Sequence, residues 1–332
     1  GEAEPRQVIA EKLTLDITVI DVDEQKVAEH VADNSQNLFD LSTGPLFQVS
    51  LLRESATEHI LLMCLHHIIS DGWSMAILVE ELSLLYKVFC AGDSNPLSSL
   101  PIQYADYSHW QRKQLRGNQL DRQVNYWRKQ LVGAPALLEL PCDRVRPRVQ
   151  TYNGAMEHFQ IGKGLSKKLG ALSDKENVTL FMSLLAVFNV LLWRYSNQDE
   201  IVVGTPVANR NRSELEGIIG FFVNTLAIRH KIEGTISFIT FLQQVRQTLV
   251  DAYSHQDIPF EHVVEELNPE RSLSHSPLFQ VMFVMQSQSS SDSALIFPDV
   301  NVSPVDQTVG ISKFDLTLSM QETDQGLIGS LE

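Results

Sequence analysis

The chain has 332 residues, of which 43% are hydrophobic and 20% charged, and a formal net charge of -15 at pH 7. This composition is typical of a globular protein with two average domains or one large two-lobed domain. The acidic balance and the lack of a marked Lys/Arg cluster argue against nucleic acid and anionic membranes as partners.

Three cysteines, Cys64, Cys90 and Cys142, lie far apart and form no C-x-x-C pair. This pattern predicts reduced, buried thiols in a cytoplasmic protein rather than a disulfide framework. The most apolar window, residues 180–193, contains a serine and an asparagine and is shorter than the roughly 20 residues of a membrane span. We therefore interpret it as a buried helix.

The first part of the chain is expected to alternate short strands and helices. In chain order we predict one or two strands in residues 7–21, a helix at 27–38, a turn at 39–47 leading into a strand through 49–51, a polar hairpin connection at 54–58 and a returning strand at 60–65.

Two adjacent histidines, His66 and His67, follow this returning strand and precede an amphipathic helix that begins near Met75. They are thus expected where a strand ends and a helix begins. Adjacent side chains on an extended backbone point to opposite faces, so the two imidazoles should have different surroundings.

Asp71, Gly72 and Ser74 lie in the turn before this helix. Aspartate and serine side chains can accept hydrogen bonds from the free N–H groups of a first helical turn. Glycine is suited to a turn with positive φ. These residues therefore predict a capped helix start.

The rest of the chain reads as helices followed by a mixed α and β pattern. We predict helices at 104–114 and 121–131, a Pro-rich connection at 135–147, a strand at 155–161 belonging to the first lobe, helices at 165–176 and 179–196, an interior strand at 201–207, a loop at 210–212, a helix at 238–253 and an alternating strand at 329–332. Tyr104, Tyr107 and Trp110 recur at helical spacing, which favours packing on one helix face.

Five ordered motifs resemble those of nonribosomal peptide synthetase condensation domains. They are H-H-x-x-x-D-G at 66–72, followed by Trp73 and Ser74; Y-x-D-Y-x-x-W at 104–110; I-G-x-F-V-N-T-L-x-x-R at 219–229; H-Q-D-x-P-F-E at 255–261; and a variant of R-D-x-S-R-N-P-L at 271–278, which departs at Ser272, His275 and Ser276.

The resemblance implies an α+β, chloramphenicol-acetyltransferase-like fold of two similar lobes, each a mixed sheet with helices, with an active-site channel between them. We predict residues 1–163 as the N-terminal lobe and 164–332 as the C-terminal lobe. Two motifs expected upstream, S-x-A-Q and R-H-E-x-L-R, are absent. We therefore expect that the chain lacks the first strand and helix of one lobe and the end of the other, and is poorly active when isolated because a sheet edge is unpaired.

The resemblance also implies the reaction. An acceptor amine attacks a donor thioester, and both substrates arrive on phosphopantetheine arms of partner carrier domains, one upstream and one downstream. An adjacent adenylation domain is expected, in a multidomain synthetase of secondary metabolites such as antibiotics. The domain itself should need no metal and no covalently bound cofactor.

Residue roles follow from the same resemblance. His67 is assigned to proton handling, either as a base or by positioning the amine, since an imidazole can accept a proton near neutral pH. His66 is expected to pack and hydrogen-bond within the strand. Asp71 is expected to hold the loop, with Arg210 as its candidate partner. The N–H of Gly72 is a candidate oxyanion donor, or the residue is a plain turn glycine.

Three more positions are candidates for structural or channel roles. Trp73 and Ser74 belong to the first motif. Asn224 either faces the channel or is a hydrogen-bonded strand-end asparagine. The segment 255–261 reads as a helix end and a turn forced by its proline.

Other enzyme classes fit less well. A Ser-His-Asp hydrolase is disfavoured because no G-x-S-x-G turn exists, and a zinc site because adjacent histidines diverge and H-E-x-x-H spacing is absent. His66 and His67 exclude the heterocyclising relatives, and the 255–261 motif favours condensation over epimerisation. A coenzyme A-dependent acyltransferase and a non-catalytic docking domain that recruits other enzymes remain open alternatives.

Overall fold

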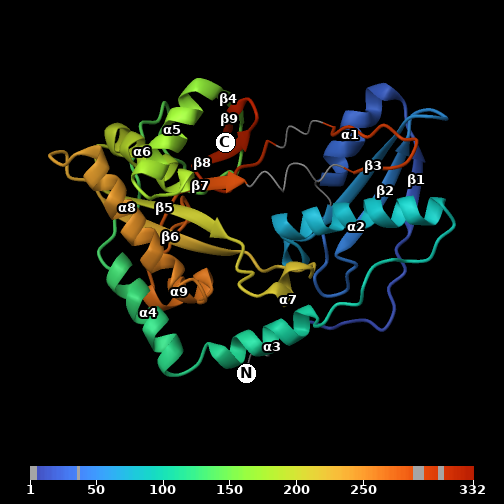
Figure 1. Cartoon of the computed structure of the whole chain (residues 1–332), viewed down its shortest axis with the longest axis horizontal. Coiled ribbons are helices and arrows are strands. Elements are labelled where there is room, and N and C mark those ends of the chain that lie inside the picture. The colour runs from blue at the N-terminus through green and yellow to red at the C-terminus, as the bar shows by residue number, and fades with distance from the viewer. Residues whose placement is uncertain (1–5, 36–37, 287–294, 306–309) are drawn as a thin grey trace. The chain divides into compact units, whose positions relative to one another are not determined.

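The computed structural model describes residues 6–35, 38–286, 295–305 and 310–332. Contacts divide the chain into two compact units, residues 1–70 and 71–332. Figure 1 labels the helices and strands, and each unit is described by itself. The lobe boundary after residue 163 stays a prediction.

The first unit is a three-stranded sheet with one helix. Strands β1 (Ile17–Asp21), β2 (Phe47–Arg53) and β3 (His59–Leu65) lie in that order, with β1 parallel and β3 antiparallel to β2. Helix α1 (Glu24–Ser35) packs on β3. Its small core consists of Val22, Val31, Leu52 and Leu62.

A six-stranded mixed sheet organises the second unit. The strands are β4 (Glu157–Gly162), β5 (Glu200–Val207), β6 (Asn224–Lys231), β7 (Val281–Gln286), β8 (Leu316–Thr323) and β9 (Gly326–Leu331). Their order is β4-β9-β8-β7-β5-β6, with parallel pairing of β7 to β5 and β8. The predicted interior strand is confirmed, because β5 has a neighbour on each side and residues 201–205 are buried.

Helices cover the β5 and β6 end of this sheet. Helices α6 (Leu180–Ser196) and α8 (Phe238–Tyr253) contact β5 and β6, respectively, and each other, and α4 (Asn118–Leu131) and α9 (Phe260–Leu267) also contact β6 (Figure 1). Helix α5 (Lys163–Lys175) contacts β4 and β9. The apolar window that we interpreted as a buried helix is α6, whose inward residues belong to the main core.

Three further helices belong to the second unit. They are α2 (Gly72–Cys90), α3 (Tyr104–Gln114) and the short α7 (Ser213–Glu216). No single described helix is long and apolar enough to cross a membrane. Helices α5 and α6, joined by a sharp bend, together meet the requirement for a membrane span in length and composition alone.

The structure corrects two of the sequence-based expectations and confirms two others. Of the one or two strands predicted in residues 7–21, it has one, β1. The strand predicted at 155–161 as part of the first lobe is β4, which pairs with β9 in the six-stranded sheet of the second unit. Local pattern could not indicate this, because β4 and β9 are far apart in the sequence. The predicted helix end and turn at 255–261 are confirmed, since α8 ends at Tyr253 and a turn connects it to α9. Cys90 and Cys142 are exposed rather than buried, since one lies at the end of α2 and the other outside any element.

Candidate active site

The double histidine lies in the first unit, between the end of β3 and the helix that follows it, as predicted. His66 is extended, with φ -69° and ψ 134°, and its N–H donates to Leu46 O at 2.9 Å. Its ring Nδ1 accepts from Ile68 N at 3.0 Å and its edge packs against Phe39 at 5.8 Å. The imidazole of His66 therefore caps the next turn.

His67 begins that turn. It is the first residue of a 3-10 helix, η1 (His67–Ile69), and its carbonyl accepts from Ser70 N at 3.4 Å. The backbone is thus not extended through both histidines, and the opposite-face argument applies only to His66. His67 is exposed while His66 is half-buried.

Asp71 begins the second unit and caps helix α2. Its Oδ1 accepts from Ser74 N at 2.8 Å, as the turn chemistry predicted. Its Oδ2 accepts from two backbone N–H groups ahead of β6, Phe222 at 2.9 Å and Val223 at 3.2 Å. The carboxylate therefore ties the start of α2 to a segment about 150 residues later.

Arg210 completes this arrangement. Its Nη2 lies 3.3 Å from Asp71 Oδ1, and the two side chains are 2% and 3% exposed, so the predicted ion pair is present and buried. Its Nη1 donates to Leu215 O at 2.5 Å and to Ile218 O at 2.7 Å. The guanidinium also lies over the Phe222 ring at 4.1 Å. Because both charges have several hydrogen bonds, the pair offsets much of its desolvation cost.

Ser74 is the centre of the network. Its Oγ accepts from Arg210 Nη2 at 2.8 Å and from Gly220 N at 3.0 Å. Its single proton can go to Asp71 Oδ1 or to Gly220 O, both at 2.8 Å. Residue 220 has to be glycine, because a Cβ there would lie 2.4 Å from the ring of Tyr104. The motif included Ser74 as a candidate residue, but the sequence did not indicate its hydrogen bonds to Gly220.

The network sets the charge of Asp71. Burial by itself raises the pKa of this carboxyl, but hydrogen bonds from Ser74 and Phe222 and the charge of Arg210 outweigh it, so the pKa lies below its usual value. Burial lowers the pKa of Arg210, although Asp71 opposes that shift. An arginine starts high enough to stay charged. The pair is therefore ionic at neutral pH.

Gly72 and Trp73 open helix α2. Gly72 has no positive φ and a Cβ there would meet nothing within 4 Å, so the expected turn glycine is wrong: the residue is already helical. Trp73 is 46% exposed and its Nε1 donates to Glu216 O at 3.1 Å. The oxyanion role of Gly72 stays a prediction.

Asn224 has every amide hydrogen bond filled by protein. Its Nδ2 donates to Gln256 O and Ile258 O, both at 2.8 Å, and its Oδ1 accepts from Thr225 N at 2.9 Å and Phe260 N at 3.0 Å. The side chain thus fastens the 255–261 motif to the start of β6. This geometry fits the strand-end interpretation of Asn224 better than a channel role.

The tyrosines of α3 pack against residues that contact the Asp71–Ser74–Arg210 network. Tyr107 packs with Leu215, Ile218 and Phe222, and Tyr104 packs against that cluster. The Tyr104 hydroxyl donates to Phe221 O at 2.7 Å. Packing was predicted for both tyrosines and is confirmed, while Trp110 is 37% exposed beneath Arg212. In the part of the chain that the structure describes, no group of three or more His, Cys, Asp or Glu could hold a metal.

A family model described as Condensation domain matches residues 1–331. The chain belongs to the condensation-domain family. One of the linear gramicidin synthase proteins of Brevibacillus parabrevis is 49% identical over 296 residues, which is 89% of this chain and 6% of that protein. The chain therefore spans only a small part of the length of the relatives that it matches.

Solved structures place the fold. A four-domain nonribosomal peptide synthetase bound to AMP and glycine superposes with a TM-score of 0.85 at 27% identity, over 97% of this chain and 25% of that one. The X-domain from teicoplanin biosynthesis gives 0.89 at 24% identity, over 98% and 75%, and shows the fold alone. The predicted α+β, chloramphenicol-acetyltransferase-like class is confirmed, and the domain is of the enzyme type that forms amide bonds in nonribosomal peptide synthesis.

Proposed function

We propose that the domain joins an acceptor amine to a donor thioester, with both substrates held on phosphopantetheine arms of neighbouring carrier domains. The amine nitrogen forms a bond to the carbonyl carbon, the carbon–sulfur bond breaks, the thiolate takes a proton, and an elongated peptide remains on the downstream carrier. The observation that carries this proposal is the complete H-H-x-x-x-D-G motif in a chain that matches the family along residues 1–331.

His67 is the residue that we propose to handle the amine proton. It is exposed at the start of η1, whereas His66 uses its Nδ1 to cap the same turn. A positioned acid or base typically contributes about 10²- to 10⁴-fold to a rate. Asp71, Arg210 and Ser74 have a structural role, because the Asp71 carboxylate, the two Nη atoms of Arg210 and the Ser74 hydroxyl bind one another and backbone groups.

The partners that we propose are an upstream donor carrier domain, a downstream acceptor carrier domain and an adenylation domain. Synthetases that contain similar domains are far longer than this chain, which leaves room for such neighbours. We also propose that the protein acts in the cytoplasm, where exposed thiols such as Cys90 and Cys142 stay reduced.

The test is dipeptide formation between two loaded carriers in the synthetase that contains this domain. We expect His67→Ala to lower the single-turnover rate by about 10²-fold or more, with an unchanged melting temperature. His59→Ala is the matched control, because His59 is an exposed histidine at the start of β3, the strand that leads to His67. Dipeptide formation by His67→Ala at the unmodified rate would refute the proton-handling role.

A recruitment domain is the second candidate. A solved complex of the X-domain and OxyB from teicoplanin biosynthesis has a similar fold, with a TM-score of 0.89 at 25% identity. If the unmodified synthetase made no dipeptide but its domain bound a partner enzyme, recruitment would replace catalysis. Product formed from acyl-coenzyme A instead of a loaded donor carrier would indicate the coenzyme A-dependent alternative.

A further inference from the structure

A hollow of about 340 Å³ lies in the second unit, between α3 and the loop of residues 209–212. Residues of α3, the start of α4, this loop and the turn between α8 and α9 line it. Its volume is at the low end of the range for pockets that bind small molecules, about 300–1,000 Å³. A ligand that fills this hollow therefore has to be small.

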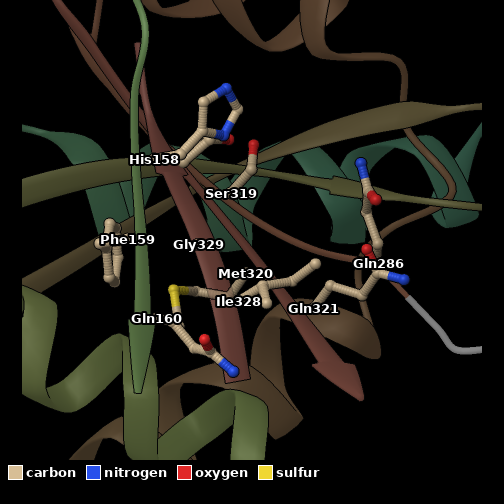
Figure 2. Close-up of a pocket in the computed structure, with 10 residues that line it drawn as sticks. His158, Phe159, Gln160, Gln286, Ser319, Met320, Gln321, Ile328 and Gly329 are labelled. Carbon is tan, nitrogen blue, oxygen red and sulfur yellow. The ribbon is translucent and has the colours of Figure 1, made fainter. Parts of the chain in front are cut away.

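The charges of the lining distinguish this hollow from the one in Figure 2. That hollow, of about 540 Å³ on the six-stranded sheet, is lined by residues such as Gln160, Gln286 and Gln321, and its described lining contains no aspartate, glutamate, lysine or arginine. Nothing there selects a ligand by charge. The hollow beside α3 is lined by both an arginine, Arg212, and an aspartate, Asp257.

Arg212 has hydrogen-bond donors available to a ligand. Its guanidinium lies over the Trp110 ring at 4.7 Å, a contact that uses the face of the group. Within the described residues, no carboxylate or carbonyl accepts from its N–H groups. A guanidinium presents five N–H donors in its own plane, in a fork that fits a carboxylate. Arg212 can therefore bind an anion while it stays on Trp110.

Asp257 is held in place without being neutralised. Gln123 of α4, which is 2% exposed, donates from its Nε2 to Asp257 Oδ2 at 3.4 Å. In the described part of the chain, neither Arg212 nor another cation forms an ion pair with Asp257. An ionised carboxylate has about four acceptor sites, so most of those on Asp257 are open to a cation in the hollow.

A buried hydroxyl in the lining is an independent sign of a ligand. Tyr107 is 5% exposed, and its oxygen accepts from Gln111 Nε2 at 3.1 Å and from Asn209 Nδ2 at 3.2 Å. Burial raises the pKa of Tyr107 to about 12, so the hydroxyl keeps its proton at neutral pH. No described residue accepts that proton. Because a buried donor normally has an acceptor, an oxygen atom of a ligand would complete the arrangement.

These groups favour a small molecule with both charges. A phosphate would be repelled by the carboxylate of Asp257, and a metal ion by the guanidinium of Arg212. A free α-amino acid has a carboxylate for Arg212 and Tyr107 and an ammonium group for Asp257, and both contacts are charge-assisted hydrogen bonds. An aminoacyl group on a carrier lacks that carboxylate, because its carboxyl carbon is part of the thioester.

The rest of the lining indicates the side chain of the ligand. The side chains of Gln114, Gln119 and Asn211 line the hollow and form no hydrogen bond within the described residues. Each of these amides offers both donors and an acceptor. They favour an amino acid whose side chain is polar and uncharged.

We propose that this hollow binds a free α-amino acid with a polar, uncharged side chain, its carboxylate on Arg212 and Tyr107 and its ammonium group on Asp257. The site is separate from the proposed reaction, whose substrates are thioesters. A bound amino acid joins α3, the 209–212 loop and the turn after α8. Since a ligand of the folded state stabilises it, the second unit should become more stable as the concentration of the free amino acid rises.

The test is calorimetric titration of the 332-residue chain with L-glutamine, N-acetyl-L-glutamine and L-glutamine methyl ester. The first compound has both charges, the second lacks the ammonium group and the third lacks the carboxylate. We expect L-glutamine to bind, and each derivative to bind about tenfold more weakly through the loss of one charged hydrogen-bond partner. If L-glutamine shows no saturable binding at millimolar concentrations, or if either derivative binds as tightly as L-glutamine, the proposal is wrong.

Two substitutions assign each charge of the ligand to its residue. Arg212→Gln should weaken the binding of L-glutamine about tenfold and change that of the methyl ester by less than about twofold. Asp257→Asn should weaken the binding of L-glutamine to the same extent and leave that of N-acetyl-L-glutamine nearly unchanged. Equal losses for the charged and the blocked ligand in either variant would overturn the assignment. Should a variant fail to fold, the comparison of the three ligands on the unmodified chain still decides.

The chain offers a matched control for each substitution. Arg194 also lies over a tryptophan ring, Trp193, at 4.4 Å, and Asp251 also accepts from a glutamine amide, that of Gln247, at 2.9 Å. Neither Arg194 nor Asp251 lines the hollow. Arg194→Gln and Asp251→Asn should therefore bind L-glutamine like the unmodified chain. Weakened binding in these two variants as well would place the ligand elsewhere and refute the site.

Discussion

The two halves of the H-H-x-x-x-D-G motif are held in different ways. His66 and His67 lie in a short turn that the His66 ring caps locally, and His67 is exposed. Asp71 lies in a buried network with partners about 140 to 150 residues away in the sequence. A motif that is continuous in sequence thus combines a part whose loss should affect chemistry with a part whose loss should affect stability.

The largest expected effect is on the buried half. Asp71→Ala leaves the charge of Arg210 buried without its carboxylate, so we expect the free energy of unfolding to fall by about 3–5 kcal/mol in urea titrations followed by circular dichroism. The control is Arg128→Ala, which breaks an ion pair with Glu266 at 3.2 Å whose side chains are 52% and 40% exposed. That change should cost less than about 1 kcal/mol.

The opposite result would reverse the comparison. If Asp71→Ala kept its melting temperature and lost dipeptide formation, Asp71 would act in the chemistry. The depressed pKa of Asp71 gives a second check. Its stabilisation is present above the unfolded pKa of about 3.9 and should be lost as the pH falls through the lower folded value, and Asp71→Ala should lack that loss.

His230 is a buried polar side chain without hydrogen-bond partners in the described chain, in contrast to Asp71 and Arg210, and it should lower stability when it becomes charged. His230 of β6 is 3% exposed and packs edge-on against Phe241 at 5.7 Å. Neither of its ring nitrogens has a hydrogen-bond partner among the described residues. Burial lowers its pKa from 6.5 to about 4.

The sign of the pH effect follows from that shift. Between about pH 6.5 and 4 the unfolded chain binds a proton that the folded chain does not, so stability falls as the pH is lowered across this window. We expect about 2 kcal/mol less stability at pH 5 than at pH 7 from this residue. His230→Leu should remove that contribution in paired urea titrations. If His230→Leu retains the full difference, the pH dependence comes from other groups and burial does not lower the pKa of His230 as described.

The smallest effect is expected in the exposed half. His66→Ala removes the acceptor for Ile68 N, and the loss of a cap costs about 0.5–2 kcal/mol locally. Amide exchange at residues 68–70 should become faster, while the melting temperature of the second unit stays unchanged. His66→Asn supplies a capping oxygen and should restore slow exchange. A large loss of global stability in His66→Ala would remove the contrast between the two halves.

Much of this arrangement could be predicted from local pattern and resemblance. Helix α8 has the predicted bounds, Phe238–Tyr253, and β5 is the predicted interior strand. The position of the histidines between a strand and a helix followed from the change in hydrophobic period. The Asp71–Arg210 pair came from the family pattern, since nothing in the spacing of two residues 139 apart indicates a contact.

Other features depended on contacts that no local pattern contains. The bond between Ser74 and Gly220 joins residues 146 apart, and the need for glycine comes from the Tyr104 ring against it. Gly72 suggested a positive φ, but the helix already begins there. Strand β4 was expected with the first lobe because it precedes the second in sequence, yet its hydrogen bonds go to β9.

The amino-acid sequence by itself determined the elements, the family and the candidate residues, because short-range periodicity, capping chemistry and motif order are written in neighbouring positions. The tertiary structure alone decided which polar groups are buried together, and which side chains share a sheet face. Gln160, Gln286 and Gln321 meet in one row only through strand register. Register depends on packing between distant segments, and that is why this row could not be predicted from local sequence pattern.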